Sequence, residues 1–219
     1  MPAEPPVPTY PLDRLPAGAE LRSVTAAPAE IAGRRALRVE LTKEVAEQGR
    51  PDVDYVDMPT FVVVPGSFGF GTIEVDILAR LTPTAPDYGR AFAGIAYHLS
   101  AGLDRFEAVY LRPLNGLQLR PAPPRHRRAV QYFAYPEWKY QRLREEYPEG
   151  TFEAGADIRA DEWIHLALDV TASAVVATIN GVKALEITDL KAAPTVGALG
   201  LFVDIGTEAY FSNLTVASA

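Results

Sequence analysis

The chain has no cysteine among its 219 residues, and only three histidines, two methionines and two tryptophans. Without cysteine there is no disulfide framework, no thiolate metal site and no cysteine nucleophile. No apolar run approaches the length of about 20 residues that spans a membrane. Positive charge is also scarce, since 21 Lys and Arg stand against 28 Asp and Glu and the formal net charge is -7. This balance disfavours nucleic acid or an anionic membrane as the main partner.

The N-terminus lacks both the basic segment and the apolar run of a signal peptide. The sequence as written therefore predicts a cytoplasmic protein, or a secreted one if a leader was trimmed. The segment instead carries six prolines, Pro2, Pro5, Pro6, Pro8, Pro11 and Pro16. Because proline opposes helices and sheet ladders, we expect residues 1–20 to form an extended arm and residues 21–219 to form a single domain.

Alternating apolar and polar residues dominate the rest of the chain, which is 48% hydrophobic. In the run TIEVDILARL, Ile73, Val75 and Ile77 share one face, and Glu74 and Asp76 share the other. Similar runs predict further strands over residues 36–42, 60–64, 90–99, 105–112, 129–134, 163–171, 174–179, 185–188, 199–204 and 209–216.

Turn signals separate these runs, and the strongest hairpin signal is Asn180-Gly181. One short helix is expected over residues 139–146, and no long helical pattern is present. Strands at short intervals with turn chemistry between them predict an all-β fold, an antiparallel β-sandwich of jelly-roll type with one short helix.

Two C-terminal segments resemble a known superfamily. They read DEWIHLALDVTASAVVATINGVKALEITDLK and VGALGLFVDIGTEAYFSNLTV. A Trp-led strand, a short strand ending in Asn-Gly, a Gly-rich strand and a final AYFSNLTV strand resemble the closing half of a concanavalin A-like lectin/glucanase jelly roll. The segments GTIEVDI, AGIAYHL and AVYLRPLNG resemble earlier strands of the same group, so the likeness covers residues 60–217.

A closer resemblance is to small bacterial laminin-G-like or 3-keto-disaccharide hydrolase-like domains, which are related to family 16 glycoside hydrolases. It rests on YLRPLNG at Tyr110–Gly116, on Gln131-Tyr132, and on YQRLR at Tyr140–Arg144. The resemblance implies a carbohydrate-active scaffold. It implies no particular reaction, because the superfamily mixes enzymes, lectins and inert modules.

One motif of the superfamily is incomplete. Its retaining glucanases resemble one another in a Glu-x-Asp-x-x-Glu strand that supplies the nucleophile and the acid. Here Glu74 and Asp76 match the first two positions, but Ala79 stands at the third. The catalytic residues are therefore not predicted, and Glu74 and Asp76 are either an acid pair or an ordinary solvated face.

Two charged clusters also have two interpretations each. Asp52, Asp54 and Asp57 are oxygen ligands of the kind that calcium prefers, but their spacing favours solvated turn residues. The basic loop Arg125–Arg128 suits capture of a phosphate or carboxylate, and equally suits a solvated loop. With scattered histidines and no Gly-rich phosphate loop before a helix, we expect no metal and no cofactor.

The densest group of polar and aromatic residues lies between residues 105 and 144, and His98 is expected nearby. It suits a polar, ring-shaped ligand, because aromatic faces stand beside planar hydrogen-bonding groups. The candidate ligand-binding residues are His98, Tyr110, Arg112, Asn115, Gln131, Tyr132, Trp138 and Arg144.

We expect these groups to converge at one end of the concave sheet. In that arrangement Arg112 would grip a hydroxyl or carboxylate by two parallel bonds, and Tyr132 or Trp138 would stack on a ring. The alternative is an internal network in which Arg112 or Arg144 pairs with Glu107 or Glu145. The small residues Gly94 and Ala96 would floor an open groove with His98 at its edge.

The function predicted from these patterns is a carbohydrate-active module that uses the concave sheet, either a sugar-binding domain or a glycosidase-like hydrolase. The expected partner is a saccharide or another small molecule. The alternatives are an intracellular enzyme of cyclase or isomerase type acting on a non-sugar small molecule, and a non-catalytic interaction domain. The oligomeric state is not predicted.

Overall fold

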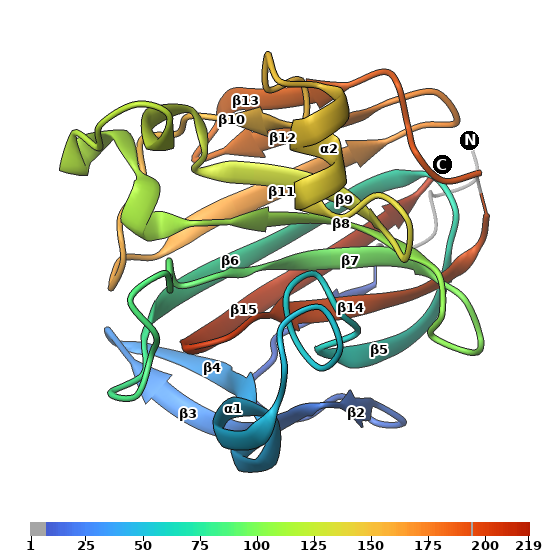
Figure 1. Cartoon of the computed structure of the whole chain (residues 1–219). Coiled ribbons are helices and arrows are strands. Elements are labelled where there is room, and N and C mark those ends of the chain that lie inside the picture. The colour runs from blue at the N-terminus through green and yellow to red at the C-terminus, as the bar shows by residue number, and fades with distance from the viewer. Residues whose placement is uncertain (1–7, 194) are drawn as a thin grey trace.

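The computed structural model describes residues 8–193 and 195–219, which form two antiparallel sheets packed face to face (Figure 1). Sheet A runs in the order β13 (Val182–Ile187), β12 (Val175–Ile179), β11 (Ile164–Val170), β6 (Gly71–Leu81), β15 (Thr207–Ser218), β4 (Arg34–Leu41) and β3 (Val24–Ile31), and β1 (Thr9–Tyr10) also pairs with β15. Sheet B runs in the order β10 (Glu153–Ala154), β9 (Val130–Tyr135), β8 (Phe106–Leu111), β7 (Ala93–Leu99), β14 (Gly197–Val203), β5 (Phe61–Phe68) and β2 (Glu20–Arg22). The predicted fold class, an all-β antiparallel jelly-roll sandwich, is confirmed.

The structure has two short helices where one was expected. They are α1 (Lys43–Gln48) and α2 (Tyr140–Glu146), and three short 3-10 turns accompany them at Pro113–Asn115, Leu117–Leu119 and Arg125–Arg127. Helix α1 begins after Thr42, whose hydroxyl accepts a hydrogen bond from the N–H of Val45 at 3.3 Å. No helix in the described part of the chain is long and apolar enough to cross a membrane.

Local patterns account for the strands. In β6, Ile73, Val75 and Ile77 are fully buried between the sheets, while Glu74 and Asp76 face outward, as alternation predicts. The hairpin between β12 and β13 turns at Asn180-Gly181, where both residues have positive φ values of 49° and 80°. Asn and Gly adopt this left-handed conformation more readily than other residues, so the turn forms where the sequence indicates it.

The outer face of sheet B, which is the face turned away from sheet A, is a second apolar layer and not an open groove. Phe61 packs edge-on against Phe106 at 5.2 Å, and Phe133 lies 5.6 Å from Phe202, with all four rings buried. Gly94 leaves no space, since a Cβ there would meet the Cα of Tyr110 at 2.4 Å. The predicted groove floored by Gly94 and Ala96 is therefore wrong, because cross-strand neighbours fill it.

The N-terminal arm pairs with sheet A from residue 8 onward. The part of the predicted arm that holds Pro2, Pro5 and Pro6 lies outside the described residues. Thr9 and Tyr10 stand opposite β15, and the N–H of Val216 donates to the carbonyl of Pro8 at 3.0 Å. Leu12 is only 2% exposed. The prediction that this arm makes no ladder is wrong, because proline lacks the N–H donor but keeps its carbonyl acceptor.

Candidate functional site

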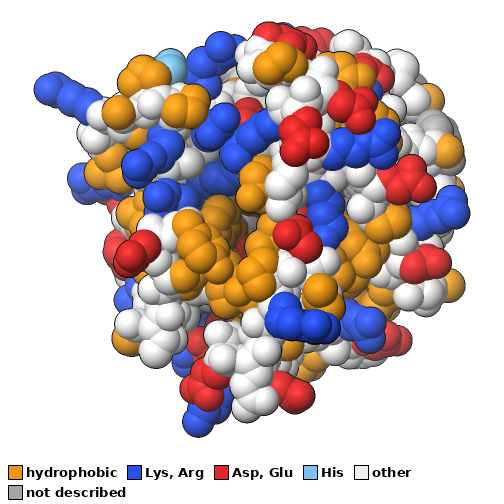
Figure 2. Space-filling model, in the orientation of Figure 1, with side chains coloured by type: hydrophobic (Ala, Val, Ile, Leu, Met, Phe, Trp, Pro, Cys, Tyr) orange, Lys and Arg blue, Asp and Glu red, His pale blue; other side chains and the backbone are white. Residues whose placement is uncertain are grey.

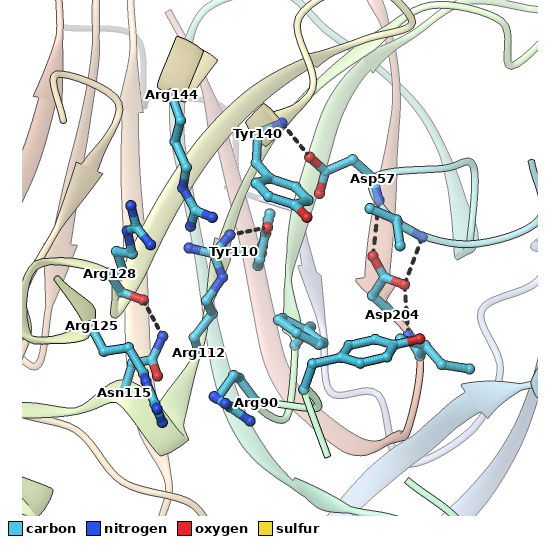
Figure 3. Close-up of a pocket in the computed structure, with 14 residues that line it drawn as sticks. Asp57, Arg90, Tyr110, Arg112, Asn115, Arg125, Arg128, Tyr140, Arg144 and Asp204 are labelled. Carbon is cyan, nitrogen blue, oxygen red and sulfur yellow. Dashed lines mark hydrogen bonds between the residues drawn. The ribbon is translucent and has the colours of Figure 1, made fainter. Parts of the chain in front are cut away.

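A pocket of about 260 Å³ opens at the end of the outer face of sheet B where β8 finishes (Figure 3). Five arginines line it, Arg90, Arg112, Arg125, Arg128 and Arg144. The other lining residues are Val56, Asp57, Tyr88, Phe92, Tyr110, Asn115, Tyr140, Asp204 and Ile205. Lys and Arg side chains gather around a hollow on this face of the molecule (Figure 2). We call this site the arginine pocket.

Four of the eight candidate residues, Tyr110, Arg112, Asn115 and Arg144, meet in the arginine pocket. Tyr110 and Arg112 point the same way because side chains two apart on a strand share a face. Pro113 then opens the 3-10 turn that brings Asn115 to the pocket. The Nδ2 of Asn115 donates to the carbonyl of Arg128 at 2.9 Å, while its buried Oδ1 has no hydrogen-bond partner within the described chain.

Arg112 is held by the protein itself and is 4% exposed. One terminal nitrogen donates to Glu153 Oε1 at 2.7 Å, and the other donates to the Tyr110 hydroxyl at 2.6 Å and to Gln131 Oε1 at 3.1 Å. Arg144 Nε donates to the second oxygen of Glu153 at 2.9 Å. Both ends of the Arg112 fork are thus occupied, and Gln131 lies fully buried behind them.

The prediction of which carboxylates pair with Arg112 and Arg144 is wrong. Glu107 and Glu145 do not pair with them, and Glu153 on β10 takes that place. Arg128 also lies 3.3 Å from Glu153. Burial pushes the pKa of Glu153 upward, but the hydrogen bonds and charges of Arg144 and Arg112 outweigh it and hold that pKa below its usual value.

Two arginines of the pocket lack such a partner. Within the described residues, no carboxylate lies within 4.0 Å of the guanidinium of Arg90 or Arg125. Arg90 donates to the backbone carbonyl of Asp87 at 2.8 Å. Burial lowers the pKa of Arg90, and the neighbouring positive charges of Arg125 and Arg112 lower it further. The pocket therefore holds more positive charge than its own carboxylates neutralise.

Two aspartates lie on the other side of the pocket (Figure 3). Asp204 accepts from the backbone N–H groups of Val56, Asp57 and Ile205 at 3.0, 2.9 and 2.6 Å, so both of its oxygens are used. Asp57 accepts from the N–H of Tyr140 at 2.7 Å. Burial, followed by the charge of Asp204, raises the pKa of Asp57 to about 6.

Asp57 also corrects the expectation of three solvated turn aspartates. Asp52 and Asp54 do lie outside the pocket, the first exposed and the second half-buried, but Asp57 is 1% exposed. It is buried because the segment before β5 folds back against the start of α2. No group of three or more His, Asp or Glu side chains in the described ranges is arranged to hold a metal ion.

The remaining candidates lie elsewhere. His98 stands at the opposite end of β7, where Nδ1 contacts Glu107 Oε2 at 2.8 Å and Nε2 contacts the carbonyl of Gly69 at 2.5 Å. Tyr132 is fully buried on the inner face of sheet B and donates to Glu107 at 2.6 Å. The expected convergence of His98 with the Arg112 group is therefore wrong, because they occupy opposite ends of paired strands.

Neither aromatic residue proposed for stacking borders the arginine pocket. Tyr132 stacks on Phe152 at 5.7 Å within the core. Trp138 lies near His98, where Arg142 covers its ring at 3.8 Å and Lys191 approaches it at 4.6 Å. The aromatic rings beside the arginines are instead Tyr140, over which Arg144 lies at 4.6 Å, and Tyr110, over which Arg112 lies at 4.9 Å. Tyr88 and Phe92 also line the pocket.

The acid pair on β6 is far from this site, on the outer face of sheet A. Glu74 and Asp76 flank His165, at 3.4 and 2.9 Å from its two ring nitrogens. Asp76 also accepts from Arg34 and Asn213. These contacts account for the pair as part of a surface charge network.

Sequence reasoning missed Arg90, Tyr140, Glu153 and Asp204 as parts of the site. Tyr140 belongs to the YQRLR motif and Arg125 and Arg128 to the basic loop, so a signal existed for these elements. No local signal marks Glu153, which lies 41 residues from Arg112 in the chain.

No protein-family model and no curated protein sequence matches the chain. Solved structures do share its fold. The carbohydrate-binding module CBM66 from Bacillus subtilis matches with a TM-score of 0.54 at 12% identity, covering 89% of this chain and 94% of that one. A Bacillus subtilis protein of unknown function with a galectin-like fold matches with a TM-score of 0.54 at 14% identity, covering 98% and 97% of the two chains. The transglycosylase Crh5 in complex with NAG also matches with a TM-score of 0.54, at 16% identity and with coverage of 96% and 84%.

Proposed function

We propose that this protein is a carbohydrate-active module that binds a saccharide in the arginine pocket. The observation that carries the proposal is Asn115, whose buried Oδ1 lines the pocket without a donor among the described residues. A buried acceptor left unpaired costs about 1–3 kcal/mol, so a ligand hydroxyl placed there would be stabilising. Tyr140 and Phe92 add ring faces at the same site, which is the combination that saccharides use.

The fold supports the proposal as a scaffold. The same sandwich carries a carbohydrate-binding module and a transglycosylase among the solved structures, at identities that establish the fold alone. The YLRPLNG and YQRLR segments, which resemble 3-keto-disaccharide hydrolase-like domains, supply Tyr110, Arg112, Asn115, Tyr140 and Arg144 to the pocket. We therefore place the proposed ligand at the end of the outer face of sheet B and not along its length.

Binding is favoured over two-carboxylate hydrolysis. Glycosidases of the usual kind need two carboxyl groups that face the ligand. Both oxygens of Asp204 accept backbone N–H groups, and both oxygens of Glu153 accept from arginines. Asp57, the remaining carboxyl group of the described lining, is 1% exposed and accepts from the N–H of Tyr140, so the described lining offers no pair of free carboxyl groups.

Isothermal titration of the full chain against neutral and acidic mono- and disaccharides tests the proposal. We expect binding by at least one sugar, weakened up to about 10-fold in Asn115→Ala, the value of one hydrogen bond. Gln118→Ala is the matched control, since Gln118 is an exposed amide in the same segment that does not line the pocket. If no sugar binds and a non-sugar metabolite does, the alternative function is supported, an enzyme of cyclase or isomerase type that acts on a non-sugar small molecule.

A further inference from the structure

We infer that the ligand of the arginine pocket is an acidic saccharide whose carboxylate or phosphate group is held by Arg90 and Arg125. This inference rests on the proposed function and specifies its ligand class. It starts from a difference among the five arginines of the pocket, three of which share Glu153 while two have no carboxylate partner within the described chain.

Charge counting shows that the surplus is local. Glu153 provides one negative charge for Arg112, Arg128 and Arg144 together, and Asp57 and Asp204 across the pocket add at most two more. Arg90 is half-buried and adds a fourth guanidinium, and the exposed Arg125 adds a fifth. The chain as a whole carries a net charge of -7, so this concentration of positive charge runs against its average. A small anion bound here would neutralise charge that the protein leaves uncompensated.

The pocket is also polarised. Arg90, Arg112 and Arg125 lie on one side, and Asp57 and Asp204 lie on the other (Figure 3). An anionic group is therefore directed to the arginine side. The guanidinium forks there match the two oxygens of a carboxylate or the several oxygens of a phosphate.

A second requirement comes from Asn115. Its Oδ1 needs a hydrogen-bond donor, whereas Arg90 and Arg125 need a negative charge, since Arg90 already donates to the backbone carbonyls of Asp87 and Gly89. A bare anion such as acetate offers no donor to Asn115, and a neutral sugar can accept from the arginines but leaves their positive charge uncompensated. A sugar that carries both hydroxyl groups and an acidic group satisfies both, and one such ring suits a cavity of about 260 Å³.

The test compares matched ligands on matched variants by isothermal titration. Glucose, glucuronate and glucose 6-phosphate form one series, galactose and galacturonate form a second, and inorganic phosphate and acetate serve as bare anions. Arg90→Gln and Arg125→Gln remove the proposed contacts. Arg127→Gln is the control, because Arg127 lies on the same 3-10 turn but donates to the carbonyl of Glu149 at 2.9 Å and does not line the pocket.

We expect an acidic sugar to bind at least ~10-fold more tightly than its neutral counterpart, since charge-assisted hydrogen bonds exceed neutral ones. That preference should vanish in Arg90→Gln and Arg125→Gln, persist in Arg127→Gln and weaken with added salt. Comparing the affinities of the uronates with that of glucose 6-phosphate identifies whether the site prefers a carboxylate or a phosphate.

The failures of the two proposals differ. Equal affinity for neutral and acidic sugars, unchanged in Arg90→Gln and Arg125→Gln, would overturn this inference and leave saccharide binding intact. Binding of bare phosphate or acetate that depends on these arginines, without binding of any sugar, would overturn the saccharide proposal and support the anion site alone.

Discussion

Two polar clusters lie at opposite ends of β7, β8 and β9, and they differ in how completely their groups are paired. In the closed cluster of His98, Glu107 and Tyr132, every side-chain nitrogen and oxygen contacts a partner. In the arginine pocket, Asn115 Oδ1 has no donor, and Arg90 and Arg125 have no carboxylate among the described residues.

The charge balance differs as well. Both ring nitrogens of His98 face acceptors, the Glu107 carboxylate and the Gly69 carbonyl. In the closed cluster the single carboxylate, Glu107, contacts His98 and accepts from Tyr132, while the pocket has a cationic surplus. The difference teaches that completed pairing indicates a structural role, and surplus donors next to solvent indicate a ligand.

The largest expected effect on stability is at Arg112, the arginine of the pocket whose donors are most fully paired. Arg112→Ala should lower the free energy of unfolding by about 3 kcal/mol, because it removes one of the three arginines of Glu153 and leaves the fully buried Gln131 Oε1 without its donor. Arg112→Lys should recover little, since one ammonium group cannot reproduce the forked contacts to Glu153, Tyr110 and Gln131. Urea titration measures both. Arg125→Ala is the control and should change stability by less than about 0.5 kcal/mol. Equal effects of the two alanine variants would erase the distinction between paired and unpaired arginines.

The next effect concerns the acidic side of the pocket. The pKa of Asp57 rises from 3.8 to about 6 through burial and then the charge of Asp204. Between these pH values the folded protein holds a proton that the unfolded chain has released, so its stability falls as pH rises, by roughly 3 kcal/mol in total. Arg112, Tyr110 and the N–H of Tyr140 also face Asp57, and each opposes the shift.

Asp57→Asn cannot ionise and keeps an acceptor for the Tyr140 N–H. Relative to the native chain, the variant should gain stability progressively from about pH 4 to about pH 6 and then level off. Denaturant titrations of both proteins across this range measure the difference, in which titrations common to both cancel. A difference that does not vary with pH would show that Asp57 stays ionised in the folded protein.

A smaller loss is expected in the closed cluster. Glu107→Gln keeps the shape of the side chain but removes the charge that His98 and Tyr132 contact, so about 2–3 kcal/mol should be lost. Ligand affinity at the arginine pocket should not change, because the two sites lie at opposite strand ends. Exposed Glu137 provides the control, and Glu137→Gln should be neutral. Weaker ligand binding in Glu107→Gln would show that the two ends are coupled.

The smallest effect is expected at Tyr97, a fully buried residue near Glu107 whose hydroxyl has no partner within the described chain. Tyr97→Phe should be neutral or stabilising by about 1 kcal/mol, since it removes an unpaired buried polar group. Tyr132→Phe is the matched comparison and should lose about 1–2 kcal/mol, because its hydroxyl joins Glu107 to the N–H of Lys191. Thermal and urea unfolding compare the two; a clear loss in Tyr97→Phe would mean that an ordered water completes the cluster.

The sequence by itself determined the fold class and most of the long strands, but not the eight-residue β3 or the helix α1. Alternation in β6 assigned Ile73, Val75 and Ile77 to the core, and the Asn180-Gly181 pair placed the β12–β13 turn. Both are local effects, because a period of two and a left-handed turn depend on neighbouring residues alone. The same locality allowed Tyr110 and Arg112 to be placed on one side of a strand.

Only the tertiary structure decided which polar residues meet. Arg112 finds Glu153 because β9 lies between β8 and β10 in sheet B, an order that no local pattern encodes. His98 and Arg112 look equally suited to a site in the sequence, yet antiparallel pairing carries them to opposite ends. Asp57 becomes a buried pocket residue because its segment folds against α2. Side-chain direction is set by the nearest residues, whereas partners and burial are set by strand order and long-range packing.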